Sequence, residues 1–263
     1  MSVGAGRVTF IGAGPGAADL ITVRGARLLA HADVVLFDAL TDPALRELAP
    51  RAEWVHVGKR GFCDSTGQTA INALLVKHAL AGKAVVRLKG GDPSVFGRLE
   101  EELEALAQAG IACEVVPGVT AAIGAAAATR RPLTRRGGGR SVSLTTAMTR
   151  EGALRASRSA DTEVFYMAGK QLAALSRRLI AAGWPTDTPA SVVSRAGWPD
   201  QLHSDHTVDS LGRAAMLHAG RPTVVTVGAG AVPIASGSTA TTQRAHEPAM
   251  GSDAPAVEPR GKP

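Results

Sequence analysis

Four consecutive residues, Gly90 to Pro93, have the types and the order expected of a ligand-binding loop. Glycines lack a Cβ, so the backbone at Gly90 and Gly91 can adopt positive φ angles and approach a bound molecule closely. The carboxylate of Asp92 can accept hydrogen bonds from that molecule, and the ring of Pro93 restricts the backbone that follows. We therefore predict that this Gly-Gly-Asp-Pro segment binds a ligand.

A second glycine-rich segment lies near the start of the chain. Residues Gly12 to Ala17 match the pattern G-x-G-x-x-G/A of dinucleotide-binding loops, and the acidic Asp38 follows about 20 residues later, as in that pattern. Taken alone, the match favours a NAD-binding Rossmann oxidoreductase. Pro15 argues against this interpretation, because dinucleotide phosphates need backbone N–H groups that lead into a helix, and proline has none. The pattern also leaves the motif Gly58-Lys59-Arg60 unexplained.

The composition restricts the class of protein. Of the 263 residues, 45% are hydrophobic and 20% are charged, which is ordinary for a globular protein. The net charge of +6 comes mainly from arginine, whose guanidinium group pairs well with carboxylates and phosphates, so a polyanionic small molecule is a suitable partner. Aromatic residues make up only 3%, which disfavours nucleic acid as a partner because base stacking needs them.

Three further features predict a cytoplasmic location and no membrane partner. The two cysteines, Cys63 and Cys113, stand alone and suggest neither a disulfide framework nor a metal site. The first residues lack the basic and apolar segments of a secretory signal. The longest run of small apolar residues, Ala121 to Ala128, is too short to span a bilayer.

The glycine loops need a scaffold, and the first half of the chain alternates between strand-like and helix-like segments. This alternation predicts an α/β fold with a parallel sheet, whose loops at the carboxyl ends of the strands form a site. We expect Ser65 or Thr66 to cap the second helix, which ends at Ala81. The predicted strands are Val8–Ile11, Val34–Phe37, Trp54–Val57, Ala84–Leu88 and Cys113–Val116, and the other predicted helices are Leu20–Ala30 and Leu99–Ala109.

The second half of the chain predicts another α/β domain and a tail. Residues Arg130 to Arg140 contain five arginines, a proline and three consecutive glycines, so we interpret them as a linker able to contact an anion. Strand-like segments recur from Ser141 to about Val232, but the chain from Ala235 onward has no apolar periodicity. We expect an N-terminal α/β domain over residues 1–135, a C-terminal α/β domain over residues 136–234, and a disordered tail over residues 235–263.

An ordered series of motifs between Val8 and about Val232 resembles the tetrapyrrole methylases. The resemblance implies two α/β domains with S-adenosylmethionine in the cleft between them, no metal, and a homodimer. One glycine motif alone would be a weak match, but the whole series, in order and at the family's spacings, is specific. The motifs are Gly12-Ala13-Gly14-Pro15-Gly16, Phe37-Asp38, Gly58-Lys59-Arg60, Gln68 with Ile71-Asn72, Val86-Arg87-Leu88-Lys89-Gly90-Gly91-Asp92-Pro93, Val95-Phe96-Gly97-Arg98, Val116-Pro117-Gly118-Val119-Thr120-Ala121, Pro132-Leu133-Thr134 and Phe165-Tyr166-Met167.

The matching positions imply roles for individual residues. Asp38 and Lys59 match positions that the family uses as proton acceptor and proton donor, and Arg98 and Glu101 match positions that face the tetrapyrrole. The residues implied to bind the cofactor are Pro15, Gly90, Gly91, Asp92, Val95, Thr120, Ala121 and Met167, together with Ala196 and Thr223, which differ from the residues common in the family at those positions.

The resemblance also implies the reaction, which is methylation of a tetrapyrrole by S-adenosylmethionine. The match is closest to members that methylate uroporphyrinogen III at C2 and C7 to give precorrin-2, the precursor of sirohaem and cobalamin. A carboxylate such as Asp38 would stabilise the ring cation formed by methylation or help a proton leave. Leu99, where the family commonly has glycine, is expected to narrow the substrate pocket.

Three alternatives remain open. The first is a methylase of the same fold that acts on a later precorrin, and the second is the NAD-binding oxidoreductase. The third is a relative that binds the cofactor without turnover, suggested by Ala17 and Ala147, where the family commonly has Asp and His.

Overall fold

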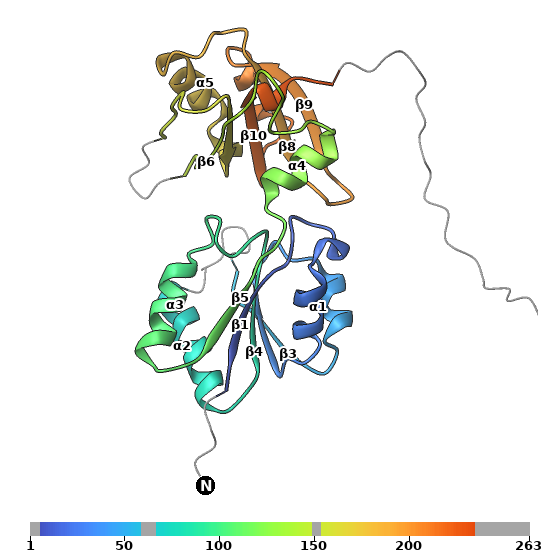
Figure 1. Ribbon diagram of the computed structural model, residues 1–263, viewed down its shortest axis with the longest axis vertical. Coiled ribbons are helices and arrows are strands. Elements are labelled where there is room, and N and C mark those ends of the chain that lie inside the picture. Colours follow the sequence, from blue (N-terminus) through green and yellow to red (C-terminus); the bar gives the residue numbers. More distant parts are fainter. Residues whose placement is uncertain (1–5, 59–66, 149–153, 235–263) are drawn as a thin grey trace, which may run out of the picture. The chain divides into compact units, whose positions relative to one another are not determined.

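The computed structural model describes residues 6–58, 67–148 and 154–234 (Figure 1). The described residues up to Pro233 belong to one compact unit that contains two five-stranded sheets. The predicted motif residue Lys59 and the tail expected from Ala235 lie outside the described residues. None of the helices in the described ranges has both the length and the apolar character needed to cross a membrane.

The first sheet is parallel throughout, as predicted. It consists of β1 (Val8–Gly12), β2 (Val34–Phe37), β3 (Glu53–His56), β4 (Val85–Lys89) and β5 (Cys113–Val116), in the order β3-β2-β4-β1-β5. Helix α1 (Val23–Leu29) covers one face, and α2 (Gln68–Leu80) and α3 (Leu99–Gln108) cover the other (Figure 1).

Burial on both faces explains the continuous apolar strands of this sheet. Successive side chains of a strand point to opposite faces, so both must find a core. In β2, Val34 and Leu36 pack in the core beneath α2 and α3, whereas Val35 and Phe37 pack in the core beneath α1. The carboxyl ends of all five strands therefore emerge at one edge of the sheet, where the glycine-rich loops follow.

Helix α2 begins differently from the prediction. Its first residue is Gln68, and Gly67 occupies the capping position without a side-chain hydrogen bond. The expected caps, Ser65 and Thr66, are therefore wrong, and both residues lie outside the described ranges. A glycine is tolerated there, because replacing a capping Ser or Asn by Gly costs only about a few tenths of a kcal/mol.

The second sheet is mixed. It consists of β6 (Val142–Thr146), β7 (Thr162–Tyr166), β8 (Pro189–Ser194), β9 (Leu202–Thr207) and β10 (Thr223–Gly228), in the order β6-β7-β10-β8-β9. Only β6 and β7 pair in parallel, and the other neighbours are antiparallel. Helix α5 (Leu172–Ala181) packs on one face through Leu172, Leu175 and Leu179. Short 3-10 segments complete the described elements at Ala18–Leu20, Pro43–Leu48, Ala168–Lys170, Leu211–Ala215 and Ala229–Ala231.

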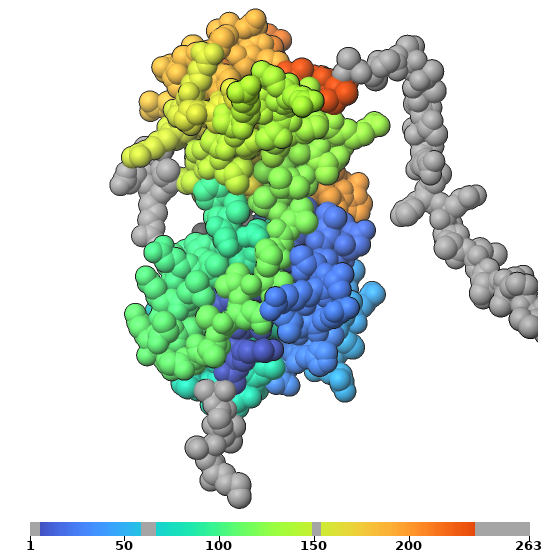
Figure 2. Space-filling model, in the orientation of Figure 1, coloured from blue at the N-terminus to red at the C-terminus, as the bar shows by residue number. Residues whose placement is uncertain are grey.

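The other face of the second sheet is covered by a helix that the sequence did not reveal. Helix α4 (Ala121–Thr129) places Ala122 and Ala125 against the second sheet, in a cluster that includes Val164 and Val224. Its sequence, AAIGAAAAT, has no polar face, so its apolar residues show no helical period. The green segment in Figure 2 carries the chain from β5 of the first sheet into α4. The domain boundary expected at residue 135 remains a prediction.

The arginine-rich segment Arg130 to Arg140 is tied to the second sheet. The guanidinium of Arg131 is buried, pairs with the carboxylate of Asp205 through both of its terminal nitrogens, and donates to the carbonyl of Ala231 at 3.1 Å. The anion that this segment contacts is thus a carboxylate of the same chain. Backbone hydrogen bonds between Arg135 and Gly139 close a tight turn in the remainder.

Candidate functional site

Three loops meet at the carboxyl edge of the first sheet. Gly14, after β1, and Gly91, after β4, exchange backbone hydrogen bonds of 2.7 and 3.2 Å. The loop after β5 crosses them so closely that a Cβ added to Gly118 would lie 2.7 Å from the Cα of Gly12. Gly91 also has a φ of +74°, a conformation open mainly to glycine. The glycines of the predicted motifs therefore allow the three backbones to converge.

The carboxylate of Asp92 fastens two of these loops together. Its Oδ1 accepts a hydrogen bond from the backbone N–H of Ser94 at 2.8 Å, and its Oδ2 accepts one from the N–H of Gly118 at 2.9 Å. The sequence predicted that Asp92 accepts hydrogen bonds from a ligand, whereas the structure shows both oxygens holding the backbone. Asp92 lines the neighbouring pocket while it performs this task.

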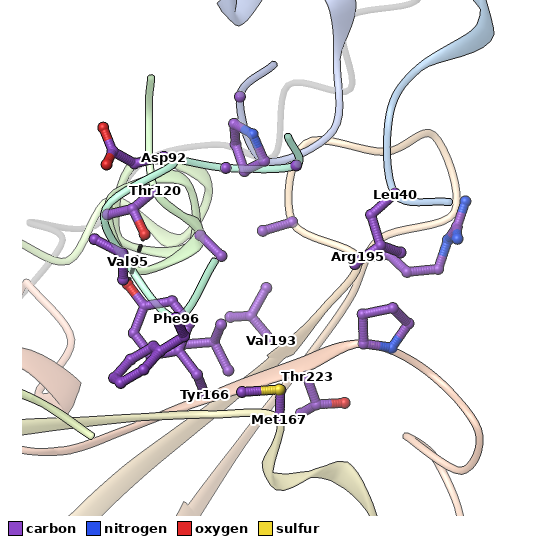
Figure 3. A pocket seen from close by; sticks show the side chains of 18 of the residues that line it. Leu40, Asp92, Val95, Phe96, Thr120, Tyr166, Met167, Val193, Arg195 and Thr223 are labelled. Atoms are coloured by element: carbon purple, nitrogen blue, oxygen red, sulfur yellow. Dashed lines mark hydrogen bonds between the residues drawn. The ribbon is translucent and has the colours of Figure 1, made fainter. Parts of the chain in front are cut away.

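A pocket opens between these loops and the second sheet (Figure 3). It has about 820 Å³ of empty space, solvent at its mouth included. All ten residues implied by the resemblance to bind the cofactor line this one pocket. They share it with Gly14, Leu40, Phe96, Tyr166, Val193, Arg195, Trp198, Pro222 and Val224.

The wall nearest the first sheet is braced by an aromatic pair. The hydroxyls of Thr120 and Tyr166 lie 2.8 Å apart, as the dashed line in Figure 3 marks, and the backbone N–H of Ala122 donates to the same tyrosine oxygen at 3.3 Å. The ring of Phe96 contacts that of Tyr166 edge to face, with centroids 5.0 Å apart. Burial raises the pKa of Tyr166, so its hydroxyl stays protonated.

Left-handed backbone conformations cluster at this site. Phe96, Met167 and Arg195 have φ values of 52°, 58° and 52°, and all three line the pocket. Arg98, with a φ of 55°, lines the pocket next to it. Such conformations are strained for residues other than glycine and typically gather where binding or catalysis requires a particular geometry. Their positions support these pockets as the functional site.

The second pocket adjoins the first and is charged. Leu40, Gly90, Val95 and Phe96 line both pockets. The remaining lining residues include Asp38, Gln68, Ile71, Arg87, Lys89 and Arg98. The structure thus brings Asp38 and Arg98 to one pocket, and it places the predicted residue Glu101 beside Arg98, where their side chains form two hydrogen bonds of 2.6 and 2.7 Å. This pairing raises the pKa of Arg98.

Two charged groups beneath this pocket are buried. Burial by itself would lower the pKa of Arg87, but the carboxylates of Asp38 and Glu102 outweigh it and raise the pKa. For Lys89 the balance is reversed: burial, aided by the charge of Arg87, lowers the pKa despite the contact with Glu102. Leu99 packs against the core beneath α2 and α3 and is absent from the lining of either pocket, contrary to the expectation that it narrows one.

The sequence did not reveal two residues that join the sheets at the pocket. The indole N–H of Trp198 donates to the carbonyl of Pro15 at 3.2 Å, and the guanidinium of Arg195 lies 4.3 Å from the centroid of the Trp198 ring. Arg195 also pairs with Asp200 at 2.7 Å. A tryptophan in a polar loop of a chain poor in aromatic residues was the available signal. In Figure 3, Arg195 and Leu40 lie across the pocket from Asp92 and Thr120.

Nothing in the described ranges resembles a metal centre, since no group of three or more His, Cys, Asp or Glu side chains there could hold an ion. The predicted absence of a metal remains a prediction. The lining of the first pocket is instead suited to an apolar molecule with a few polar groups, because aliphatic and aromatic side chains predominate and backbone amides, Thr120 and Asp92 supply the polarity.

Comparison with known proteins gives consistent results. Residues 7–212 match the model of the family Tetrapyrrole (Corrin/Porphyrin) Methylases. A uroporphyrinogen-III C-methyltransferase of Pseudomonas aeruginosa is 44% identical over 214 residues, which cover 80% of this chain and 87% of that protein. A siroheme synthase of Baumannia cicadellinicola is 43% identical over 230 residues, which cover 85% of this chain but only 50% of that protein.

Solved structures show the same architecture. Uroporphyrin-III C-methyltransferase from Thermus thermophilus, in complex with S-adenosyl homocysteine, has a TM-score of 0.74 and 34% identity, covering 85% of this chain and 97% of that one. A cobalt precorrin-4 methyltransferase has a TM-score of 0.75 and 32% identity, covering 86% of this chain and 96% of that one.

Proposed function

Because this chain belongs to the tetrapyrrole (corrin/porphyrin) methylases, we propose that it transfers methyl groups from S-adenosylmethionine to C2 and C7 of uroporphyrinogen III, giving precorrin-2. One observation carries the proposal. A largely apolar pocket lined by every implied cofactor residue shares a wall with a charged pocket that contains Asp38 and Arg98. A methyl donor in the first pocket and a polyanionic acceptor in the second would then be neighbours.

The first pocket fits the methyl donor. The close packing of Gly12, Gly91 and Gly118 leaves a side-chain-free cradle at the edge of the sheet, and Pro15, Thr120 and Ala121 continue its wall. We assign the adenosine part of the cofactor to the wall of the pocket that the second sheet forms. There, Met167, Ala196 and Thr223 offer apolar contacts and backbone groups. The bound sulfonium supplies an activated methyl group, so the protein's main task is to align donor and acceptor.

The second pocket fits the acceptor. Uroporphyrinogen III carries carboxylates around its rim, and Arg98 offers them a charged partner at the pocket surface. Methylation places positive charge on the ring, and the carboxylate of Asp38 stabilises that charge or accepts the proton that leaves. Glu101 would orient Arg98 through their paired hydrogen bonds. Lys59, outside the described residues, is retained as the proposed proton donor.

An anaerobic incubation with uroporphyrinogen III and isotopically labelled S-adenosylmethionine tests the proposal. We expect two labelled methyl groups on the tetrapyrrole by mass spectrometry, and a loss of at least about 100-fold in rate for Asp38→Ala with cofactor affinity retained. Absence of label from the tetrapyrrole would contradict the proposal. Normal cofactor affinity without any transfer would instead favour a relative that binds without turnover.

The fold does not separate this substrate from a later precorrin. The cobalt precorrin-4 methyltransferase superimposes as well as the uroporphyrin enzyme does, with TM-scores of 0.75 and 0.74. The identity of 44% to a named uroporphyrinogen-III enzyme favours the earlier substrate. Competition between uroporphyrinogen III and a later precorrin for a limiting amount of labelled cofactor distinguishes them.

The NAD-binding alternative is disfavoured by the local backbone. After the loop Gly12–Gly16 the chain forms a 3-10 turn, Ala18–Leu20, and α1 begins only at Val23, where the hydroxyl of Thr22 accepts from the N–H of Gly25 at 3.0 Å. The glycine loop therefore does not lead directly into a helix N-terminus that could hold a pyrophosphate. Calorimetry should show binding of S-adenosylmethionine and none of NAD.

We also propose a cytoplasmic homodimer that needs no metal, as the resemblance and the composition suggest. Light scattering after size exclusion should give twice the mass of the 263-residue chain. Dialysis against a chelator should leave methyl transfer unchanged. A monomer, or activity lost to the chelator and restored by a metal ion, would overturn the corresponding part.

A further inference from the structure

Four charged side chains form a continuous ionic chain from the interior to the second pocket. Glu102 of α3 is completely buried, and it accepts from the Nε of Arg87 at 2.9 Å and from the Nζ of Lys89 at 2.7 Å. The Nη2 of Arg87 then reaches the Oδ1 of Asp38 at 2.6 Å. The Arg87 and Lys89 side chains are 3% exposed, whereas Asp38 is 29% exposed and faces the pocket.

Several hydrogen bonds hold the guanidinium of Arg87 in place. Its Nη1 donates to the carbonyls of Leu36, on β2, and Leu88, on β4, at 3.4 and 3.2 Å. Its anchor Glu102 also accepts from the Nε2 of Gln68 at 3.3 Å. The guanidinium is therefore fixed relative to the first sheet, and Asp38 is its contact with the open pocket.

Stability alone does not account for this arrangement. Removing charges from water costs several kcal/mol for each ion, and buried ion pairs are often no more stabilising than well-packed apolar residues. Arg87 and Lys89 both lie on β4, whose other residues, Val85, Val86 and Leu88, are buried and apolar. A network that ends on an exposed carboxylate suits a different purpose, which is to hold that carboxylate in one orientation.

We propose that Arg87 is a positioning residue that aims the Asp38 carboxylate into the second pocket, with Glu102 and Lys89 as its buried anchor. The inference rests on the proposed methyl transfer, in which Asp38 faces the ring that becomes cationic. Oδ1 is taken by Arg87, whereas Oδ2 makes no hydrogen bond within the described ranges and is left for the acceptor in the pocket that Asp38 lines. A carboxylate fixed in advance stabilises developing charge without reorganising during the reaction.

A double-mutant cycle tests whether Arg87 acts through Asp38. We would compare wild type, Asp38→Asn, Arg87→Lys and the double variant in single-turnover methyl transfer to uroporphyrinogen III at saturating substrates. Arg87→Lys keeps the charge but loses the fork that joins both carboxylates, and we expect it to slow transfer by about 10- to 100-fold. In the Asp38→Asn background the same substitution should change the rate by less than about threefold, because the carboxylate that Arg87 positions is already gone.

Cofactor affinity separates positioning from misfolding. Arg87 does not line the first pocket, so the Kd for S-adenosylmethionine should stay within about threefold of wild type in every variant. Lys83→Gln is the matched control, because it removes an exposed ion pair of 3.2 Å with Glu53 away from both pockets, and it should leave all readouts unchanged. Should Arg87→Lys fail to bind the cofactor, Glu102→Gln, which removes only the anchoring charge, replaces it in the cycle under the same criteria.

The outcomes are distinguishable. Equal rate losses for Arg87→Lys with and without Asp38 would overturn the positioning role while leaving the proposed function intact. Wild-type protein that transfers no methyl group to uroporphyrinogen III would overturn both. A higher KM for the tetrapyrrole in Arg87→Lys, with an unchanged single-turnover rate at saturation, would also overturn the positioning role. It would show that Arg87 contributes to substrate binding.

Discussion

Asp92 shows how one carboxylate can hold together two loops of a binding site while it also lines the pocket. Its two oxygens accept from Ser94 and Gly118, which belong to different loops of the first pocket. Asn in its place keeps one accepting oxygen and turns the other position into a donor, which then faces a backbone N–H. Leaving a buried group unpaired costs about 1–3 kcal/mol.

We therefore expect Asp92→Asn to lower the free energy of unfolding by about 1–3 kcal/mol and to raise the Kd for S-adenosylmethionine several-fold. Urea denaturation and calorimetry measure the two effects. Asp161→Asn is the control: its Oδ2 alone accepts from the backbone N–H groups of Arg140 and Ser141, at an exposed place outside the lining of both pockets. It should destabilise the protein and leave the Kd unchanged, and an equal loss of affinity in both variants would contradict the assignment.

His218 is a buried base in a chain of hydroxyl groups. Its Nδ1 lies 2.9 Å from the Oγ of Ser194, and its Nε2 lies 2.9 Å from the Oγ of Ser204. Burial lowers its pKa below the ordinary 6.5, and the nearby His206 and Arg221 lower it further. Because the unfolded state then binds more protons than the folded state below pH 6.5, the contribution of His218 to stability is lost as the pH falls from 6.5 through its folded pKa.

We expect His218→Gln to reduce the acid-induced fall in the free energy of unfolding, measured by urea denaturation at successive pH values below 6.5. Some fall should remain, because burial also lowers the pKa of His206 and of His78. A slope equal to wild type in His218→Gln would show that the histidine does not carry the effect.

At the scale of elements, the site depends on the ends of three strands, which lie so close together that no room is left for a methyl group between their backbones. Gly118 follows β5, and a Cβ there would lie 2.7 Å from the Cα of Gly12 at the end of β1, closer than real Cβ atoms come. Gly12 belongs to the buried strand β1, whose backbone cannot shift without breaking its pairing with β4 and β5. The spacing of the loops is therefore set by the sheet.

We expect Gly118→Ala to lower the free energy of unfolding by about 1–3 kcal/mol, as overpacking does in cores, and to weaken binding of S-adenosylmethionine. Thermal or urea denaturation and calorimetry measure these changes. Gly138→Ala is the matched control, because its φ lies outside the left-handed region and no atom of the described residues lies within 4 Å of the added Cβ. Its stability should stay within about 0.5 kcal/mol of wild type. Similar losses in the two variants would refute the packing argument.

At the scale of the whole molecule, the first pocket is enclosed by contacts between residues of the two halves that contain the two sheets. Pro15 receives the hydrogen bond from Trp198, and a Cβ on Gly124 of α4 would lie 2.7 Å from the proline ring. The contact between Phe96 and Tyr166 joins the sheets on the other side. Ligand affinity should therefore respond to the contacts that lie between the two sheets around the pocket.

Trp198→Phe keeps an aromatic ring beneath Arg195 and removes the indole N–H. One such hydrogen bond contributes about 0.5–1.5 kcal/mol, so we expect the Kd for S-adenosylmethionine to rise by about 2- to 10-fold. Trp184→Phe removes an equivalent N–H that donates to Ser157 at 2.7 Å away from the first pocket, and it should affect stability alone. An unchanged Kd in Trp198→Phe would show that this contact does not shape the pocket.

Much of the architecture followed from local sequence. Apolar runs that stop at glycines predicted the five parallel strands and the position of the loops, because backbone sterics and hydrogen bonding act between near neighbours. The ordered motifs predicted the family, and the family match over residues 7–212 confirms it. The roles assigned to Asp38, Lys59, Arg98 and Glu101 remain predictions, although the pocket brings the first and third together.

By itself, then, the sequence determined the strand-and-loop framework, the family and ten of the residues that line one pocket. Only the tertiary structure decided which charged groups are partners and which contacts join the sheets. Arg131 pairs with a carboxylate 74 positions away, and Trp198 with a carbonyl 183 positions away. Local spacing carries no information about such pairs, because they form only where the packing of the two sheets brings distant segments within hydrogen-bond distance.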